Sequence, residues 1–513
     1  MFLKPHCLPL FITLFSLSLS SCLGSFREHP LHPKPYHPYF HTFGVSNKPN
    51  YPTLNSADLF NYNIEIRTSA PKIVNVDAFG AKANGRDDSQ AFKKAWKYAC
   101  SSSQRATLVV PKKKVYHLKP IDFSGPCKSA ISLNGTIRAT VNHSDYERYE
   151  GRWLYFDKVQ NLVEGGGIIN GNGRTWWENS CKINKALAVT FNECNNLIVA
   201  SLLIKNAQQM HLSFRKCVNV KAFNLLVKAP GHSPNTDGIH VTETQNININ
   251  NCVIGTGNQT LVNLNNPGHL NIPMSMLCCS IYLTTPFNCI EGDDCISIVS
   301  GSKNVRATGI TCGPGHGISI GSLGDRKSAA YVSNVLVNNT ILSGTTNGVR
   351  IKAWQGGSGY ARNIRFQNIV MYNVSNPIII DQNYCDQQKP CPKQVSAVRV
   401  SNVFYKNMRG TSASRVAMKF DCSKSFPCRG IFLQDVALRP QEEEQEDIGK
   451  ASCAMLDYLI EGMFLHLAHL NQIQEHNYGF GFVVSRCPRQ SCNGGPKGYH
   501  NFYASVSRYP YSE

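Results

Sequence analysis

The sequence has few acidic side chains and little charge of either sign. Its 513 residues contain 33 Asp and Glu against 52 Lys and Arg, which gives a formal net charge of +19. Charged residues make up 17% of the chain and hydrophobic residues 42%, so a large buried core is possible. The length alone would allow about three average domains. A strongly basic protein favours an anionic partner, and nucleic acid and acidic polysaccharide are the two candidates.

The apolar run at the start of the chain is too short to cross a membrane. Lys4 and His6 precede the run 8–15, and small residues follow as far as Gly24. A spanning helix needs about 20 apolar residues, whereas this pattern is typical of a secretory signal peptide over residues 1–24. A buried N-terminal helix is the alternative. A secreted basic protein meets acidic polysaccharide before it meets nucleic acid, so we expect neither a nucleic-acid nor a membrane partner.

The twenty cysteines show no spacing typical of a zinc site, which makes a structural metal centre a weaker interpretation than disulfide bonds. The pairs Cys295/Cys312, Cys385/Cys391 and Cys422/Cys428 could each close a small loop, although sequence does not fix the connectivity. Five Asn-x-Ser/Thr glycosylation motifs are consistent with secretion. They begin at Asn134, Asn142, Asn258, Asn338 and Asn373.

Ordered structure is expected only after a long polar segment. Residues 25–70 are rich in His, Pro and Tyr, which indicates a disordered tail or a pro-segment. Beyond it, Asp87 and Asp88 precede apolar residues at helical spacing. These are Ala91, Phe92, Ala95, Trp96 and Ala99. We therefore predict a short N-terminal capping helix, with the two carboxylates satisfying its free N–H groups rather than acting as a catalytic pair.

From Val159 onward the chain repeats. Asn followed by an apolar residue and a short β-branched run occurs at Asn161, Asn196, Asn219, Asn246, Asn304, Asn334, Asn363 and Asn402. Intervals such as 23 residues (196 to 219) and 29 residues (334 to 363) indicate a solenoid of short strands. The regular leucines and helical halves of a leucine-rich repeat are missing. We predict an all-β, right-handed parallel β-helix over residues 71–505, with the asparagines stacked as an internal ladder.

Four short polar motifs between residues 235 and 352 each accompany a β-branched run. They are Asn235-Thr236-Asp237-Gly238, Gly292-Asp293-Asp294, Gly315-His316-Gly317 and Arg350-Ile351-Lys352. Glycoside hydrolysis needs one carboxylic acid to protonate the leaving oxygen and one carboxylate to activate water. Carboxylates in one cleft can divide these roles because their mutual repulsion raises one pKa. Arg350 and Lys352 are two residues apart, so they share one face of a strand and suit an acidic sugar.

In this order, the four motifs closely resemble those of plant polygalacturonases of glycoside hydrolase family 28. The likeness extends from about Asn75 to Leu438, with a fragment beyond. It implies the same β-helix and inverting hydrolysis of α-1,4 links in polygalacturonate by a secreted cell-wall enzyme, which we expect to be a monomer without metal or organic cofactor.

The resemblance also implies residue roles. Asp293 is the general acid, Asp237 and Asp294 hold and activate water, and His316 supports the acid. Substrate binding falls to Asn235, Arg350, Lys352 and Tyr384, although a buried structural tyrosine is the alternative for Tyr384. His316 lies between two glycines, so we expect it to be unshielded. His211 and His240 are interpreted as ordinary polar residues.

Two stretches interrupt this family pattern. Residues 257–291 separate Thr256 from Gly292, and their removal would leave 23 residues between Asn246 and Asn304. Residues 455–476 have apolar positions that could form an amphipathic helix. Both resemble translated introns, and tolerated surface loops are the alternative.

Three other functions remain open. A relative acting on rhamnogalacturonan or other substituted pectin would share the motifs. A pectate lyase would share the fold but form an unsaturated product. A non-catalytic pectin-binding wall protein would result if the first interruption had destroyed the site.

Overall fold

The computed structural model describes residues 71–103, 105–178, 186–231, 233–257, 292–386, 391–440, 450–454, 456–461 and 501–502. The predicted signal peptide, the segment 25–70 and nearly all of the two interruptions lie outside the described residues. All described residues belong to one compact unit. Among them, no helix combines the length and the apolar composition that crossing a lipid bilayer requires.

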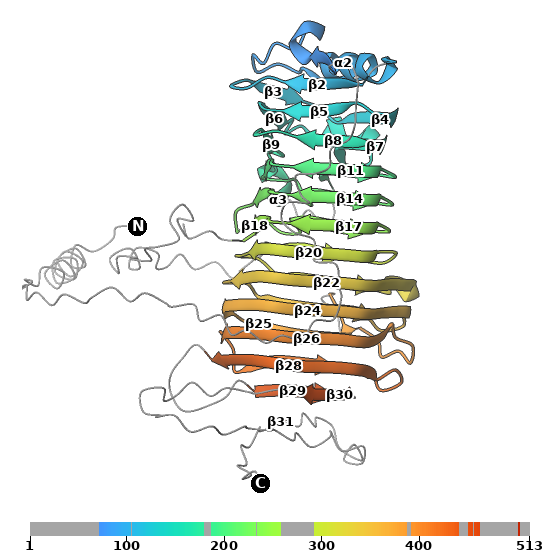
Figure 1. Ribbon diagram of the computed structural model, residues 1–513, viewed down its shortest axis with the longest axis vertical. Coiled ribbons are helices and arrows are strands. Elements are labelled where there is room, and N and C mark those ends of the chain that lie inside the picture. The colour runs from blue at the N-terminus through green and yellow to red at the C-terminus, as the bar shows by residue number, and fades with distance from the viewer. Residues whose placement is uncertain are drawn as a thin grey trace, which may run out of the picture. The chain divides into compact units, whose positions relative to one another are not determined.

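The described chain winds as a right-handed parallel β-helix, as predicted, and its strands stack coil upon coil (Figure 1). Within the described residues, nineteen strands form sheet A: β1 (Lys72–Asn75), β2 (Ala106–Val110), β3 (Val115–Leu118), β5 (Ala130–Leu133), β6 (Thr136–Ala139), β8 (Asn161–Glu164), β9 (Ile168–Asn170), β11 (Asn195–Ala200), β12 (Leu203–Lys205), β14 (Val218–Phe223), β15 (Leu226–Lys228), β17 (Gln245–Asn250), β18 (Val253–Gly255), β20 (Lys303–Cys312), β22 (Ala329–Ser343), β24 (Ser358–Val374), β26 (Arg399–Ser412), β28 (Cys428–Pro440) and β30 (Leu456–Glu461).

Twelve described strands form sheet B, parallel except for the last pair. They are β4 (Ile121–Cys127), β7 (Arg152–Val159), β10 (Leu187–Asn192), β13 (Leu212–Arg215), β16 (Ile239–Thr242), β19 (Ile296–Ile298), β21 (Ile318–Leu323), β23 (Asn347–Trp354), β25 (Asn376–Tyr384), β27 (Val416–Asp421), β29 (Lys450–Ala454) and β31 (Asn501–Phe502). The described helices are α2 (Ser89–Ser101) and α3 (Arg174–Glu178), with 3₁₀ turns η2 (Val76–Phe79), η3 (His143–Tyr149) and η5 (Asp325–Lys327).

The core forms because side chains alternate along each strand and the coils stack in register. One file of inward residues runs through ten successive strands of sheet B, from aromatic rings at the first coils to isoleucines near the middle. Its members are Phe123, Phe156, Phe191, Phe214, Val241, Ile298, Ile320, Ile351, Ile380 and Phe420. All ten are buried. Because the register holds inside, the outward residues of the same strands also stand in straight files.

Helix α2 caps the N-terminal end of the β-helix, as predicted. Its five apolar stripe residues are all buried, and Trp96 packs edge-on against Phe123. Asp87 accepts a hydrogen bond from the N–H of Ser89, the first helical residue, at 2.9 Å. Asp88 instead accepts from the N–H of Lys82 in the preceding loop at 2.8 Å. Both carboxylates are structural, but only the Asp87 carboxylate accepts a hydrogen bond from the helix N-terminus; Asp88 does so with its main-chain oxygen.

The asparagine ladder exists, but it is external rather than internal. Side-chain amides donate from coil to coil, at 2.8–3.3 Å, through Asn196, Asn219, Asn246, Asn304, Asn334, Asn363 and Asn402. All seven have φ between 53° and 58° and are exposed. This left-handed conformation bends the chain where it enters a strand of sheet A, and it turns the side chain outward. Asparagine tolerates the conformation better than most residues. The backbone of Asn161 pairs with Leu197 rather than with Asn196, so the repeat is out of register at this position.

The three cysteine pairs that could close small loops are all disulfide-bonded: Cys295–Cys312, Cys385–Cys391 and Cys422–Cys428. A fourth, Cys100–Cys127, joins α2 to β4 and was not predicted. The second interruption begins as a strand: β30 pairs in parallel with β28, so the predicted amphipathic helix is wrong for residues 456–461.

Candidate active site

The site lies on the outer face of sheet B, where one outward file crosses five neighbouring strands. Its members are Ser213, His240, Ser297, Ser319 and Arg350. The turns that lead into β16, β19 and β21 place Asp237, the pair Asp293–Asp294 and His316 beside this file. Main-chain bonds fix the turns to one another, with Gly238 N donating to the carbonyl of Asp294 and His316 N to that of Asp293, both at 2.9 Å.

Asp237 is a buried carboxylate with two polar neighbours. Its Oδ2 accepts a hydrogen bond from Ser297 at 2.6 Å and lies 3.4 Å from Nδ1 of His240. Burial would raise the pKa of Asp237. The hydrogen bond and positive charge of His240, together with the Ser297 hydroxyl, outweigh burial and the nearby Asp294, so the pKa falls below its ordinary value. Asp237 is therefore held in its ionised form.

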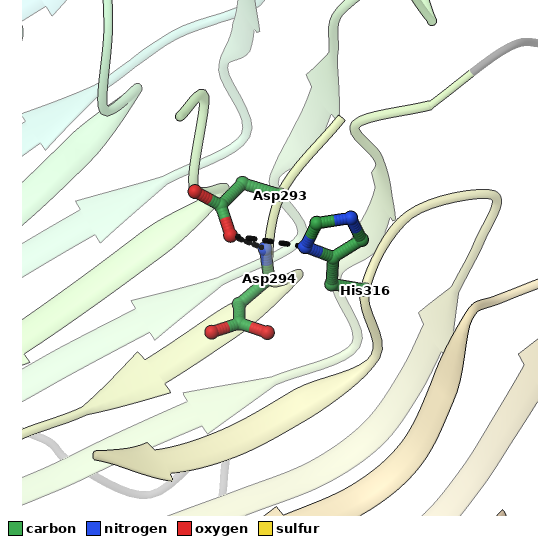
Figure 2. Close-up of side chains that lie close together, drawn as sticks. All are labelled: Asp293, Asp294 and His316. Carbon is green, nitrogen blue, oxygen red and sulfur yellow. Dashed lines mark hydrogen bonds and ion pairs between the residues drawn. The ribbon is translucent and has the colours of Figure 1, made fainter. Parts of the chain in front are cut away.

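Asp293 has the opposite bias. Burial raises its pKa, and the negative charge of Asp237 raises it further, against the lowering effect of His316. Oδ1 of Asp293 lies 3.4 Å from Nδ1 of His316, and Figure 2 shows the carboxylate turned toward that ring. Burial lowers the pKa of His316, but the hydrogen bond and charge of Asp293 outweigh this and raise it. Asp293 is thus the carboxyl group biased toward the protonated state.

Asp294 points to the other side of the turn in Figure 2 and is held by cations. Its Oδ1 accepts from Nη2 of Arg350 at 3.0 Å and from Ser319 at 2.7 Å. Its Oδ2 accepts from Nζ of Lys352 at 3.0 Å. As predicted, Arg350 and Lys352 share a face while Ile351 is in the core. Both cations nevertheless contact Asp294 directly, which the sequence did not indicate.

Glycines allow this close packing of turns. A β-carbon on Gly292 would lie 1.2 Å from the carbonyl oxygen of Thr256, and one on Gly317 would lie 2.0 Å from that of Asn347. Position 292 therefore requires glycine, because the backbone of Thr256 leaves no room for a β-carbon. The expectation that flanking glycines leave His316 unshielded is wrong, because its side chain is only 20% exposed.

Two of the expected substrate-binding residues lie at the edges of the site. Asn235 occupies the left-handed region, with φ 53°, in the turn that leads to Asp237. Tyr384 ends β25, packs edge-on against Trp354 with ring centroids 5.2 Å apart, and lies 5.5 Å from Nζ of Lys352. It is half-buried, so its ring keeps an accessible surface.

A cation could in principle be held here, since ligand atoms of Asp293, Asp294 and His316 lie within 4.8 Å of one another. The donor set does not fit one well. Both oxygens of Asp294 already accept bonds from Arg350 and Lys352, whose positive charges would repel a metal ion.

The structure also places His240 in the site, which the sequence did not indicate. Besides its contact with Asp237, its Nδ1 lies 2.7 Å from Oγ of Ser297. The alternation of side chains along the strand could have indicated this position. Ile239 and Val241 are typical core residues, so His240 between them points outward, on the face of sheet B that carries the site. His211 does behave as an ordinary buried histidine, with Nδ1 3.0 Å from the main-chain oxygen of Asp237.

Comparison with known proteins identifies the family. The model for glycosyl hydrolases family 28 matches residues 100–281 and 274–453, and the junction of the two matches falls within the interruption 257–291. The chain is 55% identical over 397 residues to polygalacturonase QRT2 of Arabidopsis thaliana, covering 75% of this chain and 82% of the relative. It is 54% identical over 398 residues to a polygalacturonase of Persea americana, covering 75% and 78%.

Among solved structures, an exopolygalacturonase from Thermotoga maritima matches with a TM-score of 0.56 at 19% identity, covering 77% of this chain and 93% of that one. This likeness supports the fold. The chain belongs to glycosyl hydrolase family 28.

Proposed function

We propose that this protein is a polygalacturonase that hydrolyses α-1,4 links between galacturonate units of pectin, and that it is secreted to the cell wall. Relatives at 54–55% identity that are named polygalacturonases support the reaction class. The predicted signal peptide supports secretion. The observation that carries the mechanism is the opposite bias of two carboxyl groups in one site, with the pKa of Asp237 lowered and that of Asp293 raised.

In this mechanism Asp293 donates its proton to the glycosidic oxygen as that bond breaks. Asp237 accepts a proton from the water that attacks the anomeric carbon from the opposite face, and the configuration inverts without a covalent intermediate. Positioned acid catalysis of this kind contributes roughly 10²–10⁴-fold. His316 holds the Asp293 carboxyl in place through their 3.4 Å contact.

Asp294 acts in this proposal as the group that fixes Arg350 and Lys352, in addition to the water-holding role implied by the resemblance. Arg350 uses two of its five N–H groups, at Nε and Nη2, to bind Ser319 and Asp294. Its remaining N–H groups can bind a uronate carboxylate, and Tyr384 and Asn235 border the same site. Carboxylate recognition favours plain galacturonate over rhamnogalacturonan or other substituted pectin.

The test is reducing-end release from polygalacturonate by the purified mature chain, with the anomeric form of the first product read by NMR. The expected result is release with inversion and no unsaturated product. A product that absorbs in the ultraviolet would identify a lyase. Binding of polygalacturonate without any release would identify a non-catalytic wall protein, and faster cleavage of a rhamnose-containing pectin would identify the substituted-pectin relative.

A further inference from the structure

The outer surface of sheet A carries almost only positive charge along seven of its strands. They are β14, β17, β20, β22, β24, β26 and β28, which stack one above another in Figure 1. These strands contain ten basic residues and a single acidic one, Asp435. The ten are Lys221, Lys303, Arg306, Arg362, Arg365, Arg399, Lys406, Arg409, Arg429 and Arg439, and all are exposed. The whole chain has 52 basic to 33 acidic residues, so this surface, called the basic face below, departs strongly from the average.

The register arranges these cations in files along the helix axis. Lys303, Arg362 and Arg429 share one file, with Ser333 and Ser401 on the strands between them. Arg306 and Arg365 share a second file, with Leu336 between them. Alternate strands lie roughly 10 Å apart, so like charges are not directly opposite one another. The result is a regular row of cations.

These cations have no carboxylate partners within the part of the chain that the structure describes. Some lie against aromatic rings instead: the guanidinium of Arg362 is 4.2 Å from the ring centre of Tyr360, and that of Arg365 is 5.4 Å from that of Phe404. Phe404 stacks on Phe432 with ring centres 4.5 Å apart, which continues the second file beyond Arg365. The rings hold the guanidinium groups in place, and guanidinium groups bind carboxylates.

A groove gives the face a shape as well as a charge. It has a volume of about 470 Å³ and is lined by Asn248, Arg306, Leu336 and three consecutive asparagines of the external ladder. The amides of Asn248 and the ladder can bind hydroxyl groups, next to the guanidinium of Arg306. The groove is separate from the candidate active site, whose side chains stand on the outer face of sheet B.

We propose that the basic face is a second polysaccharide-binding surface, which holds an acidic chain such as unesterified polygalacturonate along the helix axis, away from the catalytic site. The choice of polymer rests on the proposed function. The surface itself rests on the charge, register, aromatic contacts and groove described above. Its role is to keep the protein on a long polymer, so it should matter for long chains and not for short ones.

The test compares two fourfold variants with the parent. The basic-face variant carries Lys303→Gln, Arg306→Gln, Arg362→Gln and Arg365→Gln. The control loses the same charge at exposed sites near the N-terminal cap, through Lys82→Gln, Lys94→Gln, Lys97→Gln and Lys112→Gln. All proteins carry Asn338→Gln and Asn373→Gln, because these residues of β22 and β24 have glycosylation motifs on strands of the basic face. Binding to polygalacturonate is measured with Asp293→Asn added, and turnover of trigalacturonate without it.

The expected result is roughly tenfold weaker binding of the polymer by the basic-face variant, since each exposed ion pair contributes a few-fold, against less than twofold for the control. Turnover of trigalacturonate should stay within twofold of the parent. Equal losses in both variants, or unchanged polymer binding, would overturn the proposal, as would loss of trimer turnover in a folded variant. Duplex DNA held as tightly as polygalacturonate would assign the face to nucleic acid instead.

If the fourfold variant does not fold, the double variant Arg306→Gln and Arg365→Gln replaces it in the same binding and turnover measurements. Failure of the proposed function is distinguishable, because the parent would then release no reducing ends while the binding comparison would still report on the basic face.

Discussion

Nζ of Lys352 lies 3.0 Å from Oδ2 of Asp294, and the side chains are 10% and 2% exposed. The two residues are 58 positions apart in the chain. Lys352 belongs to β23, whereas Asp294 precedes β19, so the pair connects coils on either side of β21. Arg350 holds the other oxygen of Asp294 at 3.0 Å. Asp294 thereby fixes both cations and, through the main chain, the neighbouring Asp293.

Lys352→Met should destabilise the protein, because Asp294 would remain charged and buried with one cation fewer. Removing one partner of a buried pair costs about 3–5 kcal/mol, and the remaining Arg350 should keep the loss toward the lower figure. Chemical denaturation measures this change in the free energy of unfolding. The double variant with Asp294→Asn should recover part of the loss. A single variant as stable as the parent would show that the contact contributes nothing.

Asp293→Asn should abolish hydrolysis while leaving polygalacturonate binding largely intact. Asn keeps the shape of the side chain but has no acidic proton to donate, and the lost catalysis is on the order of 10²–10⁴-fold. Initial rates of reducing-end release and equilibrium binding to the polymer separate the two effects. Turnover within about threefold of the parent would remove Asp293 from the acid role.

The plot of hydrolytic activity against pH should be bell-shaped, with Asp237 controlling the acidic limb and Asp293 controlling the alkaline limb. Activity is lost as pH falls through the lowered pKa of Asp237, which must be ionised, and lost as pH rises through the raised pKa of Asp293, which must be protonated. His240→Gln removes a positive charge that lowers the pKa of Asp237, so the acidic limb should move to higher pH. The alkaline limb should stay. His143→Gln, in η3, is the control, and an unchanged acidic limb in His240→Gln would contradict the assignment.

Deleting residues 257–291 should preserve the fold and increase turnover. The two ends of the stretch already meet, because a β-carbon on Gly292 would lie 1.2 Å from the oxygen of Thr256. Thr256 also donates a hydrogen bond to the main-chain oxygen of Asp293 at 2.6 Å. The deletion removes Cys278, Cys279 and Cys289, which could exchange with the disulfide Cys295–Cys312.

Both proteins should be expressed in the same secretory host and compared for reducing-end release. Equal turnover of the two folded proteins would show that the stretch is a tolerated surface loop rather than a translated intron.

Repetition and the spacing of apolar residues were enough to predict the β-helix and the capping helix, and cysteine spacing indicated three pairs that could close small loops. Alternation along a strand also placed Arg350 and Lys352 on one face, with Ile351 inside. What these patterns do not contain is the register between coils. That register places Ser319 and Arg350 beside Asp294. It also places Ser297 beside Asp237 and His240. The hydrogen-bond and ion-pair partners of the charged residues therefore could not be predicted.

One further feature was predicted wrongly and one was missed, each for a physical reason. Repetition indicated the asparagine ladder correctly, but the positive φ that turns Asn219 and its equivalents outward is not visible in a repeat pattern. Cys100 and Cys127 were missed because their pairing depends on where α2 packs against β4, 27 residues later. The roles of the site residues, and the limits of the β-helix domain, stay predictions that the experiments above address.

The coil-by-coil construction also sets the order in which the site would come apart. In a solenoid each coil is stabilised mainly by its neighbours, so partial unfolding spreads inward from an end. Fraying from the C-terminal coils would release Tyr384 of β25 first, then Lys352 and Arg350 of β23, then His316, and Asp293 and Asp237 only afterwards. Such a molecule would lose its hold on the acidic sugar while its two catalytic carboxyl groups were still in place.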